Sequence, residues 1–395
     1  MDIQKITIDI PEKFDKKEFV KNLSFVSESI VSYTFYNDSV VIKYKKNPHN
    51  EILQKRIIET VNNVLSVVDV KNEEVYKTSL NESKKIKFLK ASEVYDGNNI
   101  VDFHNGTIGL CGDMVYLFDF FDNIFKLFAI SLGAKEEKYP VLLQAKTLED
   151  SGYLKISPEY SLFVGNVKED MEELKKISAS GQVKVIETDG KNVLSPSACF
   201  HIYEKYRNAN LGDFTSVTTL QSVFRNEGRF AWGEFGRLKD YHVREIVFIG
   251  NQQYVDDSLN TLMEKTTLLL KNIGLVGTIE SAGDSFILPQ MQRYKKVQLH
   301  KKAKYEVKLN YSDDDVLSAA SFNRHGRTFA YAFDIKVENK TDIVTGCAGY
   351  GIERFILAFI SKYGYDREKW PESVNLYINN CKKRGEKDYE ENIGN

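Results

Sequence analysis

The chain has 395 residues, 42% of them hydrophobic and 28% charged, a composition typical of a soluble globular protein. Its formal net charge of −2 gives no broad electrostatic reason to expect nucleic acid as the main partner, although a neutral surface can still carry local basic patches. The four cysteines form no CxxC pair, and no apolar run approaches the roughly 18 residues of a membrane span. We therefore expect a cytoplasmic protein without a disulfide framework and without a membrane partner.

Residues 1–83 predict a small α/β accessory domain with the order β-α-β-β-α. The expected elements are residues 5–10, 16–26, 30–36, 40–44 and 51–68. Asn37-Asp38 separates the second and third strands and favours a hairpin turn. Nothing in this segment suggests chemistry, so we interpret it as an inert structural or docking module.

Residues 84–104 are expected to form a connector to a larger domain over residues 105–381. Bulky apolar side chains repeat on one helix face at residues 117–128, and Gly133 fits a C-cap. Core packing or dimer packing explains this aromatic helix without a ligand. The charged tail, residues 382–395, is poor in apolar residues, and we expect it to fray.

From residue 182 onward the chain is rich in predicted strands, with helices between them. The clearest strand patterns cover residues 183–187, 222–227, 241–250, 305–310 and 328–337. Long loops and hairpins connect them in place of regular β-α-β units. This favours an antiparallel sheet flanked by helices, and hence an α+β domain, over a dinucleotide-binding fold.

One predicted hairpin, residues 222–250, concentrates charged and aromatic side chains. Arg225 and Glu227 are two residues apart and share a face of the first strand, as Tyr241 and Glu245 do on the second. The hairpin would thus present a cation, two carboxylates and an aromatic ring to one site. Spacing alone leaves a solvated hairpin with surface ion pairs equally open.

A glycine-rich turn leads into an apolar helix near the C-terminus. Gly346, Gly349 and Gly351 allow a ligand to approach the backbone closely, and Arg354 falls in the first helical turn, where anions are favoured. The turn is not a P-loop, because the GKS/T ending is absent. Glycine-rich turns before helices are common, so this pattern alone is a weak signal.

Together these two stretches resemble motifs 2 and 3 of the class II aminoacyl-tRNA synthetases. The matches are FRNE at residues 224–227 with the fRxE signature, Arg237, Tyr241 and Glu245 with the returning strand, and Gly349-x-Gly351-x-x-Arg354 with GxGxxR. Tyr139-Pro140 after the aromatic helix fits motif 1, the dimerisation element. The resemblance implies a class II antiparallel sheet flanked by helices, an ATP site and a homodimer.

Four segments narrow the resemblance further: SPSACFHIYEKY, RLKDYHVREIVFIG, SFNRHGRTFAYAFDI and TGCAGYGIERF. In this order they resemble a zinc-dependent branch that holds the methanogen-type seryl-tRNA synthetases and the amino acid:carrier-protein ligases. The similarity covers about residues 105–365. Both groups bind zinc through Cys, Glu and Cys, which match Cys199, Glu245 and Cys347 here. Without the resemblance, each cysteine would more simply be a small buried hydrophobe.

The resemblance implies that an amino acid carboxylate attacks the α-phosphate of ATP. This nucleophile is already ionised, so catalysis rests on positioning and charge neutralisation. By resemblance, Arg225 contacts the α-phosphate and the carboxylate, and Arg354 contacts the γ-phosphate. Glu227 contacts the adenine amino group, Tyr241 stacks on the ring, and Arg237, Gly349 and Gly351 complete the nucleotide site. Glu306 corresponds to the carboxylate of the magnesium–phosphate site, unless it is one of many exposed glutamates.

The family places the α-amino group at an open position of a tetrahedral zinc, and Ser321 and Asn323 near the side chain. A small amino acid is implied, with Phe322 and Phe329 closing off space. His325 follows in the same loop, and we assign it no role. The sequence does not identify the amino acid.

The expected acceptor of the amino acid depends on the N-terminal segment that precedes this core. Seryl-tRNA synthetases need an RNA-binding extension, but the first 80 residues show no sustained heptad pattern. We therefore favour a phosphopantetheinylated carrier protein over tRNA, although the extra N-terminal domain departs from the shorter ligases. A catalytically silent regulator is the third hypothesis, and the complete set of motif residues speaks against it.

Overall fold

The computed structural model of the chain describes residues 2–46, 48–65, 72–77, 87–183 and 186–392. The N-terminal unit has the predicted order β-α-β-β-α: β1 (Ile3–Asp9), α1 (Lys16–Leu23), β2 (Ile30–Phe35), β3 (Ser39–Lys45) and α2 (Asn50–Leu65). Its antiparallel sheet has the order β1-β3-β2. Both helices pack on the sheet around a core of their own, in which Phe19, Val40 and Ile57 are fully buried. Residues 66–68 of the second predicted helix lie outside the described residues.

The largest sheet in the described part of the chain has eight strands in the order β4-β16-β17-β18-β20-β15-β14-β7. The strands are β4 (Glu74–Lys77), β7 (Lys135–Glu136), β14 (Thr215–Phe224), β15 (Asp240–Gly250), β16 (Gly277–Ser281), β17 (Lys304–Asn310), β18 (Val316–Gly326) and β20 (Val344–Gly351). Neighbouring strands are antiparallel except for β7 and β14. The antiparallel α+β architecture that the sequence predicts is therefore confirmed.

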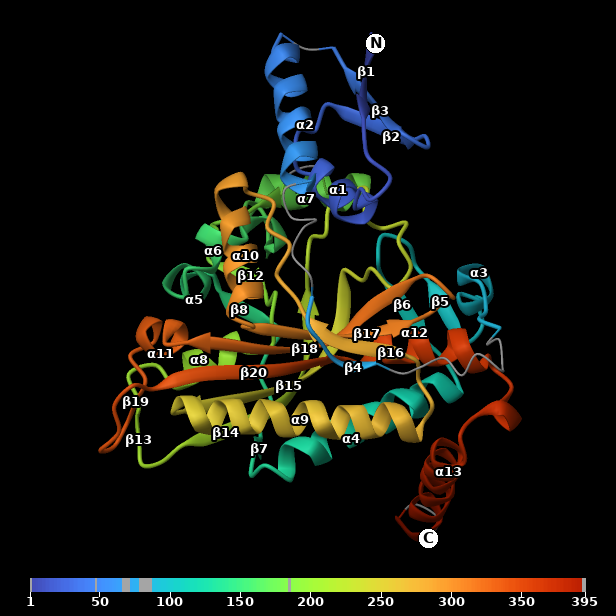
Figure 1. The fold of residues 1–395 in the computed structure, drawn as a ribbon, viewed down its shortest axis with the longest axis vertical. Coiled ribbons are helices and arrows are strands. Elements are labelled where there is room, and N and C mark those ends of the chain that lie inside the picture. The colour runs from blue at the N-terminus through green and yellow to red at the C-terminus, as the bar shows by residue number, and fades with distance from the viewer. Residues whose placement is uncertain (1, 47, 66–71, 78–86, 184–185, 393–395) are drawn as a thin grey trace.

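Three helices cover one face of this sheet: α4 (Asp113–Ile130), α9 (Gln252–Asn272) and α12 (Ile352–Tyr363). Figure 1 shows α4 and α9 below the sheet and the N-terminal unit above it, on the opposite side. The aromatic side chains of α4 are covered within the chain, because Phe125 stacks on Tyr350 at 4.1 Å between ring centroids. Burying each large apolar side chain fully contributes roughly 1.5–3 kcal/mol. Core packing thus explains most of this aromatic helix.

Strand alternation separates the two faces of the sheet. On β15, Ile246 and Phe248 belong to the core beneath α4 and α9, and Arg244 is buried on the same face. Arg244 donates to both carboxylate oxygens of Asp122 on α4, at 2.7 and 2.8 Å. Because side chains alternate along a strand, Tyr241, Val243 and Glu245 turn to the opposite face. That face is open to the N-terminal unit.

Most of the remaining elements surround the open face and the sheet ends, whereas the C-terminal helix packs against α4. The strands are β5 (Ile100–Asp102), β6 (Ile108–Leu110), β8 (Leu142–Gln144), β9 (Leu162–Phe163), β10 (Asn166–Val167), β11 (Ile186–Glu187), β12 (Asn192–Leu194), β13 (Asn210–Leu211) and β19 (Lys336–Val337). The helices are α3 (Ala91–Val94), α5 (Ala145–Asp150), α6 (Tyr153–Ile156), α7 (Met171–Ser180), α8 (Phe200–Lys205), α10 (Gln292–His300), α11 (Thr328–Ala332) and α13 (Glu372–Asn392). None of the helices among the described residues is long and apolar enough to cross a membrane.

Several predicted elements need correction. Residues 328–337 form α11 and the short β19 in place of one strand, since Phe329 and Phe333 pack at helical spacing beside Tyr203. The strand predicted at residues 222–227 begins seven residues earlier and ends at Phe224. The predicted strand at 183–187 is reduced to β11, with residues 184–185 outside the described part. The aromatic helix ends at Ile130 with Ser131 as its C-cap, ahead of Gly133, and the backbone of the tail continues α13 to Asn392.

Candidate active site

Cross-strand neighbours bring the predicted site residues together on the open face of the large sheet. In one row across the strands, Thr219 pairs with Glu245, Glu245 with Gly349, Gly349 with Ser321, and Ser321 with Glu306. The adjacent row on the same face pairs Val247 with Cys347, Cys347 with Asn323, and Asn323 with Lys304. Directly opposed side chains on one face of an antiparallel sheet contact each other. The sheet register therefore assembles residues that are far apart in the sequence.

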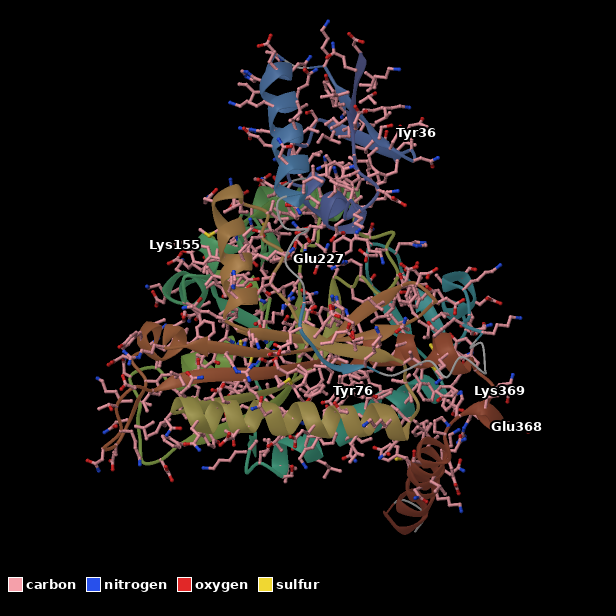
Figure 2. The ribbon with its side chains drawn as sticks, in the orientation of Figure 1. Tyr36, Tyr76, Lys155, Glu227, Glu368 and Lys369 are labelled. Atoms are coloured by element: carbon pink, nitrogen blue, oxygen red, sulfur yellow. The ribbon has the colours of Figure 1, made fainter. Side chains whose placement is uncertain are left out.

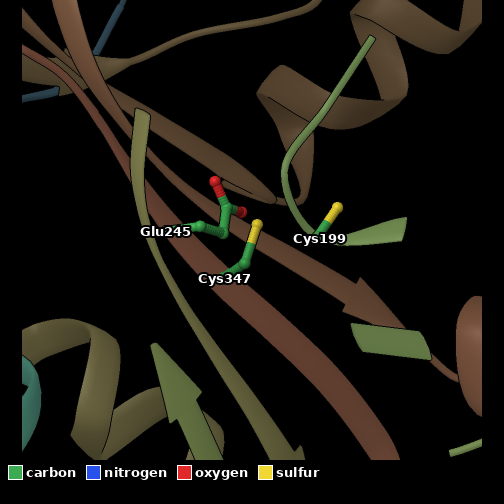
Figure 3. A group of neighbouring side chains, drawn as sticks. All are labelled: Cys199, Glu245 and Cys347. Carbon is green, nitrogen blue, oxygen red and sulfur yellow. The ribbon is translucent and has the colours of Figure 1, made fainter. Parts of the chain in front are cut away.

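A cluster of two thiols and one carboxylate lies at the centre of these rows (Figure 3). One donor atom from each of Cys199, Glu245 and Cys347 lies within 4.8 Å of the other two, and all three residues are buried. Cys199 reaches the sheet from the N-cap position of α8. Gly349 makes room for the carboxylate, because a Cβ at that position would stand 2.8 Å from Glu245 Oε2.

Burial disfavours ionisation of Glu245, and burial together with the neighbouring acidic groups disfavours ionisation of Cys347. Burial raises the pKa of Glu245 to about 7, against the opposing effects of its hydrogen bond with Cys347 and of the Arg225 charge. The hydrogen bond with Cys199, burial and the neighbouring Glu245 carboxylate together raise the pKa of the Cys347 thiol well above its ordinary value. A buried dication would offset this repulsion, and two thiolates with one carboxylate are ligands that zinc accepts. The donor set therefore fits a zinc ion.

Polar side chains around the cluster point at its sulfur atoms. Asn323 Nδ2 lies 3.6 Å from Cys347 Sγ and 3.1 Å from Ser321 Oγ, and Ser197 Oγ lies 3.3 Å from Cys199 Sγ. His325 Nε2 is also 3.6 Å from Cys347 Sγ, and its Nδ1 lies within hydrogen-bond distance of the hydroxyl groups of Tyr203 and Thr345. Donors at these positions orient and stabilise metal-binding thiolates. Ser321 and Asn323 thus lie beside the cluster.

Two arginines approach the open face. Arg225 follows the end of β14 and donates from Nε to Pro196 O at 2.9 Å. Arg354, in the first turn of α12, donates from Nη1 to Ser318 O at 2.9 Å and lies 5.0 Å from the centroid of the Tyr241 ring. The Nε of Arg354 is buried and has no hydrogen-bond partner among the described residues. Both guanidinium groups therefore keep donors for a bound anion.

A third group of charges surrounds Glu227, which lies between the N-terminal unit and the large sheet (Figure 2). Burial alone would raise the pKa of Glu227, but Lys21, Arg237 and Arg225 outweigh it and lower the pKa to about 2. Arg237 Nη1 lies 3.4 Å from Glu227 Oε2, and Arg237 also pairs with Glu234 at 2.9 Å. The carboxylate is thus ionised at neutral pH although it is only 3% exposed.

Glu306 is part of a partly buried chain of charges. Lys304 Nζ lies 2.8 Å from Glu306 Oε1 and 2.6 Å from Asp284 Oδ1, and Ser318 Oγ donates to Glu306 Oε2 at 2.7 Å. Burial opposes ionisation, but Lys304 and Ser318 lower the pKa of Glu306. Glu306 therefore lies partly buried on the open face beside Ser321, and its part in a magnesium–phosphate site stays a prediction.

Comparison with known proteins identifies this region. Residues 182–363, which include the cluster, both arginines and Glu227, match the family model of the tRNA synthetase class II core domain (G, H, P, S and T). The chain contains a class II tRNA synthetase core domain. The predicted resemblance and the class II sheet are confirmed.

Curated relatives of this class II domain are ligases with two different acceptors. Amino acid–[acyl-carrier-protein] ligase 1 of Bradyrhizobium diazoefficiens is 26% identical over 252 residues, which are 61% of this chain and 76% of that ligase. The type-2 serine–tRNA ligase of Methanococcus maripaludis is 26% identical over 265 residues, 62% of this chain and 51% of that enzyme. The chain thus spans about half the length of the curated serine–tRNA ligases that it matches.

Solved structures share the fold of the class II domain. The M. kandleri seryl-tRNA synthetase, crystallised with A. aeolicus tRNASec, superposes with a TM-score of 0.68 at 18% identity, over 96% of this chain and 78% of that one. The Pyrococcus horikoshii seryl-tRNA synthetase complexed with ATP gives a TM-score of 0.57 at 13% identity, over 85% of this chain and 83% of that chain. At these identities the likeness shows the fold alone.

The class II motifs did not reveal every charged group in the site. Lys21, Asp284 and Lys304 lie outside the motifs. Tertiary packing brings Lys21 to Glu227 and Asp284 to Lys304, whereas Lys304 shares the face of Glu306 because the two are two residues apart on β17. One predicted pocket residue is wrong: Phe322 is fully buried in the core on the opposite face, edge-on to Tyr350, because it alternates with Ser321 and Asn323. The period of two along β18 could have excluded Phe322 from the sequence alone.

Proposed function

We propose that this protein is a ligase that activates a small amino acid with ATP to an aminoacyl-adenylate. The observation that carries the proposal is the buried cluster of Cys199, Glu245 and Cys347 on the same face of a class II core as Arg225 and Arg354. The cluster fits the recognition of an amino group, and the arginines fit the recognition of phosphate. The two curated relatives described above are both named as ligases, and they support this assignment.

Zinc would be held by Cys199, Glu245 and Cys347 and would supply a binding site for the α-amino group of the substrate. The chain's own residues then place the carboxylate. Arg225, next to the cluster, carries the positive charge that an α-phosphate and a carboxylate need to approach each other. Arg354 supplies a second charge from the start of α12, and Glu306 offers a carboxylate for magnesium bound to the phosphates. Charge neutralisation and positioning account for the chemistry without a general base.

The surroundings of the cluster support a small substrate. Ser321 and Asn323 line it on one side with short polar groups. Tyr203, His325 and Phe329 pack together behind it, with Tyr203 and Phe329 stacked at 4.6 Å between ring centroids. A filled aromatic layer leaves little depth for a large side chain. We therefore propose serine, glycine or alanine as the substrate class.

We further propose a carrier-protein thiol as the acceptor, in a cytoplasmic homodimer. The carrier-protein ligase from Bradyrhizobium diazoefficiens supports the acceptor. For the dimer, Val115, Leu127 and Ile130 stay exposed on α4, the helix that precedes the predicted dimerisation element, although the aromatic residues of this helix are buried or partly buried. Light scattering at micromolar concentration tests the dimer, and a monomer there contradicts it.

Transfer to tRNA is the second candidate, and the serine–tRNA ligase relatives favour it. The proposal of activation is common to both candidates. It is tested by amino-acid-dependent ATP–pyrophosphate exchange over all common amino acids. Exchange with one or a few small amino acids supports the proposal. Exchange only with a large aromatic or basic amino acid contradicts the proposed substrate class, and exchange with none contradicts the proposed function.

A further inference from the structure

The N-terminal unit is docked on the nucleotide side of the class II domain through a set of specific contacts. Arg229 donates to three backbone carbonyls of the unit, those of Ser24, Ser27 and Ile30, at 3.1, 2.7 and 3.1 Å. Phe230 packs edge-on against Tyr33 at 5.5 Å between centroids. Both Arg229 and Phe230 follow Glu227 in the loop between β14 and β15. The unit therefore rests on the loop that carries Glu227.

Helix α1 adds ionic contacts to two other segments of the class II domain. Lys17 Nζ lies 3.0 Å from Asp315 Oδ1, in the turn between β17 and β18. Glu18 Oε1 accepts from Ser285 Oγ at 2.8 Å and lies 3.6 Å from Lys295 Nζ on α10. Several contacts that do not involve Lys21 thus hold α1 in place. Substitution of Lys21 leaves these contacts intact.

Lys21 extends from α1 into the charged group around Glu227. Its Nζ lies 3.2 Å from Glu227 Oε2 and 4.7 Å from the centroid of the Tyr160 ring, and the residue is only 7% exposed. A buried lysine is costly unless it is paired. The N-terminal unit therefore places a full positive charge inside the class II domain, against the carboxylate of its second motif.

We propose that Lys21 is a positioning residue of the nucleotide site, which makes the N-terminal unit a working part of that site. Lys21 and Arg237 both engage Oε2 of Glu227, and no described residue forms a hydrogen bond with Oε1. The pair holds the carboxylate ionised and leaves one oxygen for a ligand donor. The exocyclic amino group of a purine base is such a donor. This inference rests on the proposed function for the identity of the ligand, ATP.

The contact between Lys21 and Glu227 also couples the N-terminal unit to the class II domain. If binding of the acceptor to the N-terminal unit moves α1, Glu227 loses one of its two cationic partners and orients the base less well. This differs from the inert module that we expected from the sequence. In the opposite relationship, Lys21 competes with the base for Glu227. Removal of the Lys21 charge would then strengthen ATP binding, whereas our proposal expects ATP binding to weaken.

The test compares Lys21→Met with two controls. Lys21→Arg keeps a cation at the same place, and Lys17→Met removes the exposed cation one turn earlier on α1. Binding of ATP and of inosine triphosphate, which lacks the amino group, is measured by titration calorimetry on the full chain. Thermal unfolding of each variant confirms folding. The KM values for ATP and for the amino acid are measured in the exchange assay.

We expect Lys21→Met to weaken ATP binding about tenfold or more while inosine triphosphate binding changes by less than about threefold. Lys21→Arg stays within about threefold of wild type, Lys17→Met matches wild type, and the KM for the amino acid does not change. If Lys21→Met binds ATP as tightly as wild type, or more tightly, this inference is overturned. Equal weakening for both nucleotides also overturns it, because the effect is then not exerted at the base. A wild-type protein that binds neither nucleotide contradicts the proposed function as well.

Discussion

Asn323 on β18 lies directly opposite Cys347 on β20, and its side-chain nitrogen is 3.6 Å from the cysteine sulfur. An amide donor at this distance stabilises a thiolate and does not add charge. The residue predicted to contact the substrate is thus also in contact with a predicted zinc ligand. Substrate recognition and metal binding share one row of the sheet.

We predict one zinc ion per subunit, bound by Cys199, Glu245 and Cys347. Serine is a poor zinc ligand, so Cys199→Ser combined with Cys347→Ser should abolish metal binding. Elemental analysis of purified protein measures the zinc content. Cys111→Ser is the matched control, because Cys111 is exposed and lies outside the cluster. Stoichiometric zinc in the double variant would show that the metal is bound elsewhere.

Arg225→Ala should abolish adenylate formation and leave the protein folded. Loss of a charge-assisted contact to the reacting phosphate costs at least roughly 3 kcal/mol of transition-state stabilisation, or about a hundredfold in rate. Loss of the hydrogen bond to Pro196 O costs only about 1 kcal/mol of stability. ATP–pyrophosphate exchange and thermal unfolding measure the two effects. Arg327→Ala, at an exposed arginine, is the control. Exchange within tenfold of wild type would contradict the role of Arg225.

Ionisation of Glu227 should make folding stability depend on pH. Its pKa is about 2 in the folded protein against an ordinary value of 4.5, so the stabilisation is complete above about pH 4.5 and is lost as the pH falls through 2. The full effect is about 3 kcal/mol. Urea unfolding from pH 7 to pH 3 measures the free energy of unfolding of wild type and of Glu227→Gln. The difference between the two free energies should become smaller as the pH falls. A gap independent of pH would show that the carboxylate is not held ionised.

Asp122→Ala should destabilise the fold by about 3–5 kcal/mol, because it leaves Arg244 buried on the core face without its main partner. Arg244 is only 2% exposed, and the remaining contact with Glu136 is long, at 3.4 Å. Urea unfolding gives the free energy. Asp119→Ala, at an exposed position on the same helix, should change it by less than about 0.5 kcal/mol. Equal effects of both substitutions would contradict this account.

The sequence predicts local patterns better than long-range contacts. Alternation along residues 241–250 correctly placed Tyr241 and Glu245 on one face, because the period of two is a property of the strand itself. Residues 328–337 misled the strand prediction, because their aromatic residues suit a strand equally well until Tyr203 fixes Phe329 and Phe333 on one helix face. No local pattern reveals that Lys21 reaches Glu227, since only the docking of one unit on another brings them together.

The curated relatives are named for two different acceptors of the activated amino acid, a carrier protein and tRNA. We predict transfer of the activated amino acid to the phosphopantetheine thiol of a carrier protein. The thiol attacks the adenylate carbonyl, a thioester forms and AMP leaves. One flexible arm can deliver the thiol, so little surface is needed, whereas tRNA recognition normally requires many phosphate contacts from Lys and Arg. With a net charge of −2 and Lys17 and Lys21 of α1 already paired, the described N-terminal surface gives weak support to tRNA.

The experiment incubates the enzyme with ATP, its labelled amino acid and either total tRNA or a holo carrier protein. The apo carrier, which lacks the phosphopantetheine arm, is the matched control for the thiol. Label that appears on the holo carrier alone, and that neutral hydroxylamine releases, supports a thioester acceptor. The salt dependence gives a second criterion, because tRNA charging should fall steeply with salt while delivery of a thiol by a flexible arm should not. Efficient charging of tRNA with no label on the holo carrier would show that the accessory unit serves RNA recognition, and that the serine–tRNA ligases are the better functional guide.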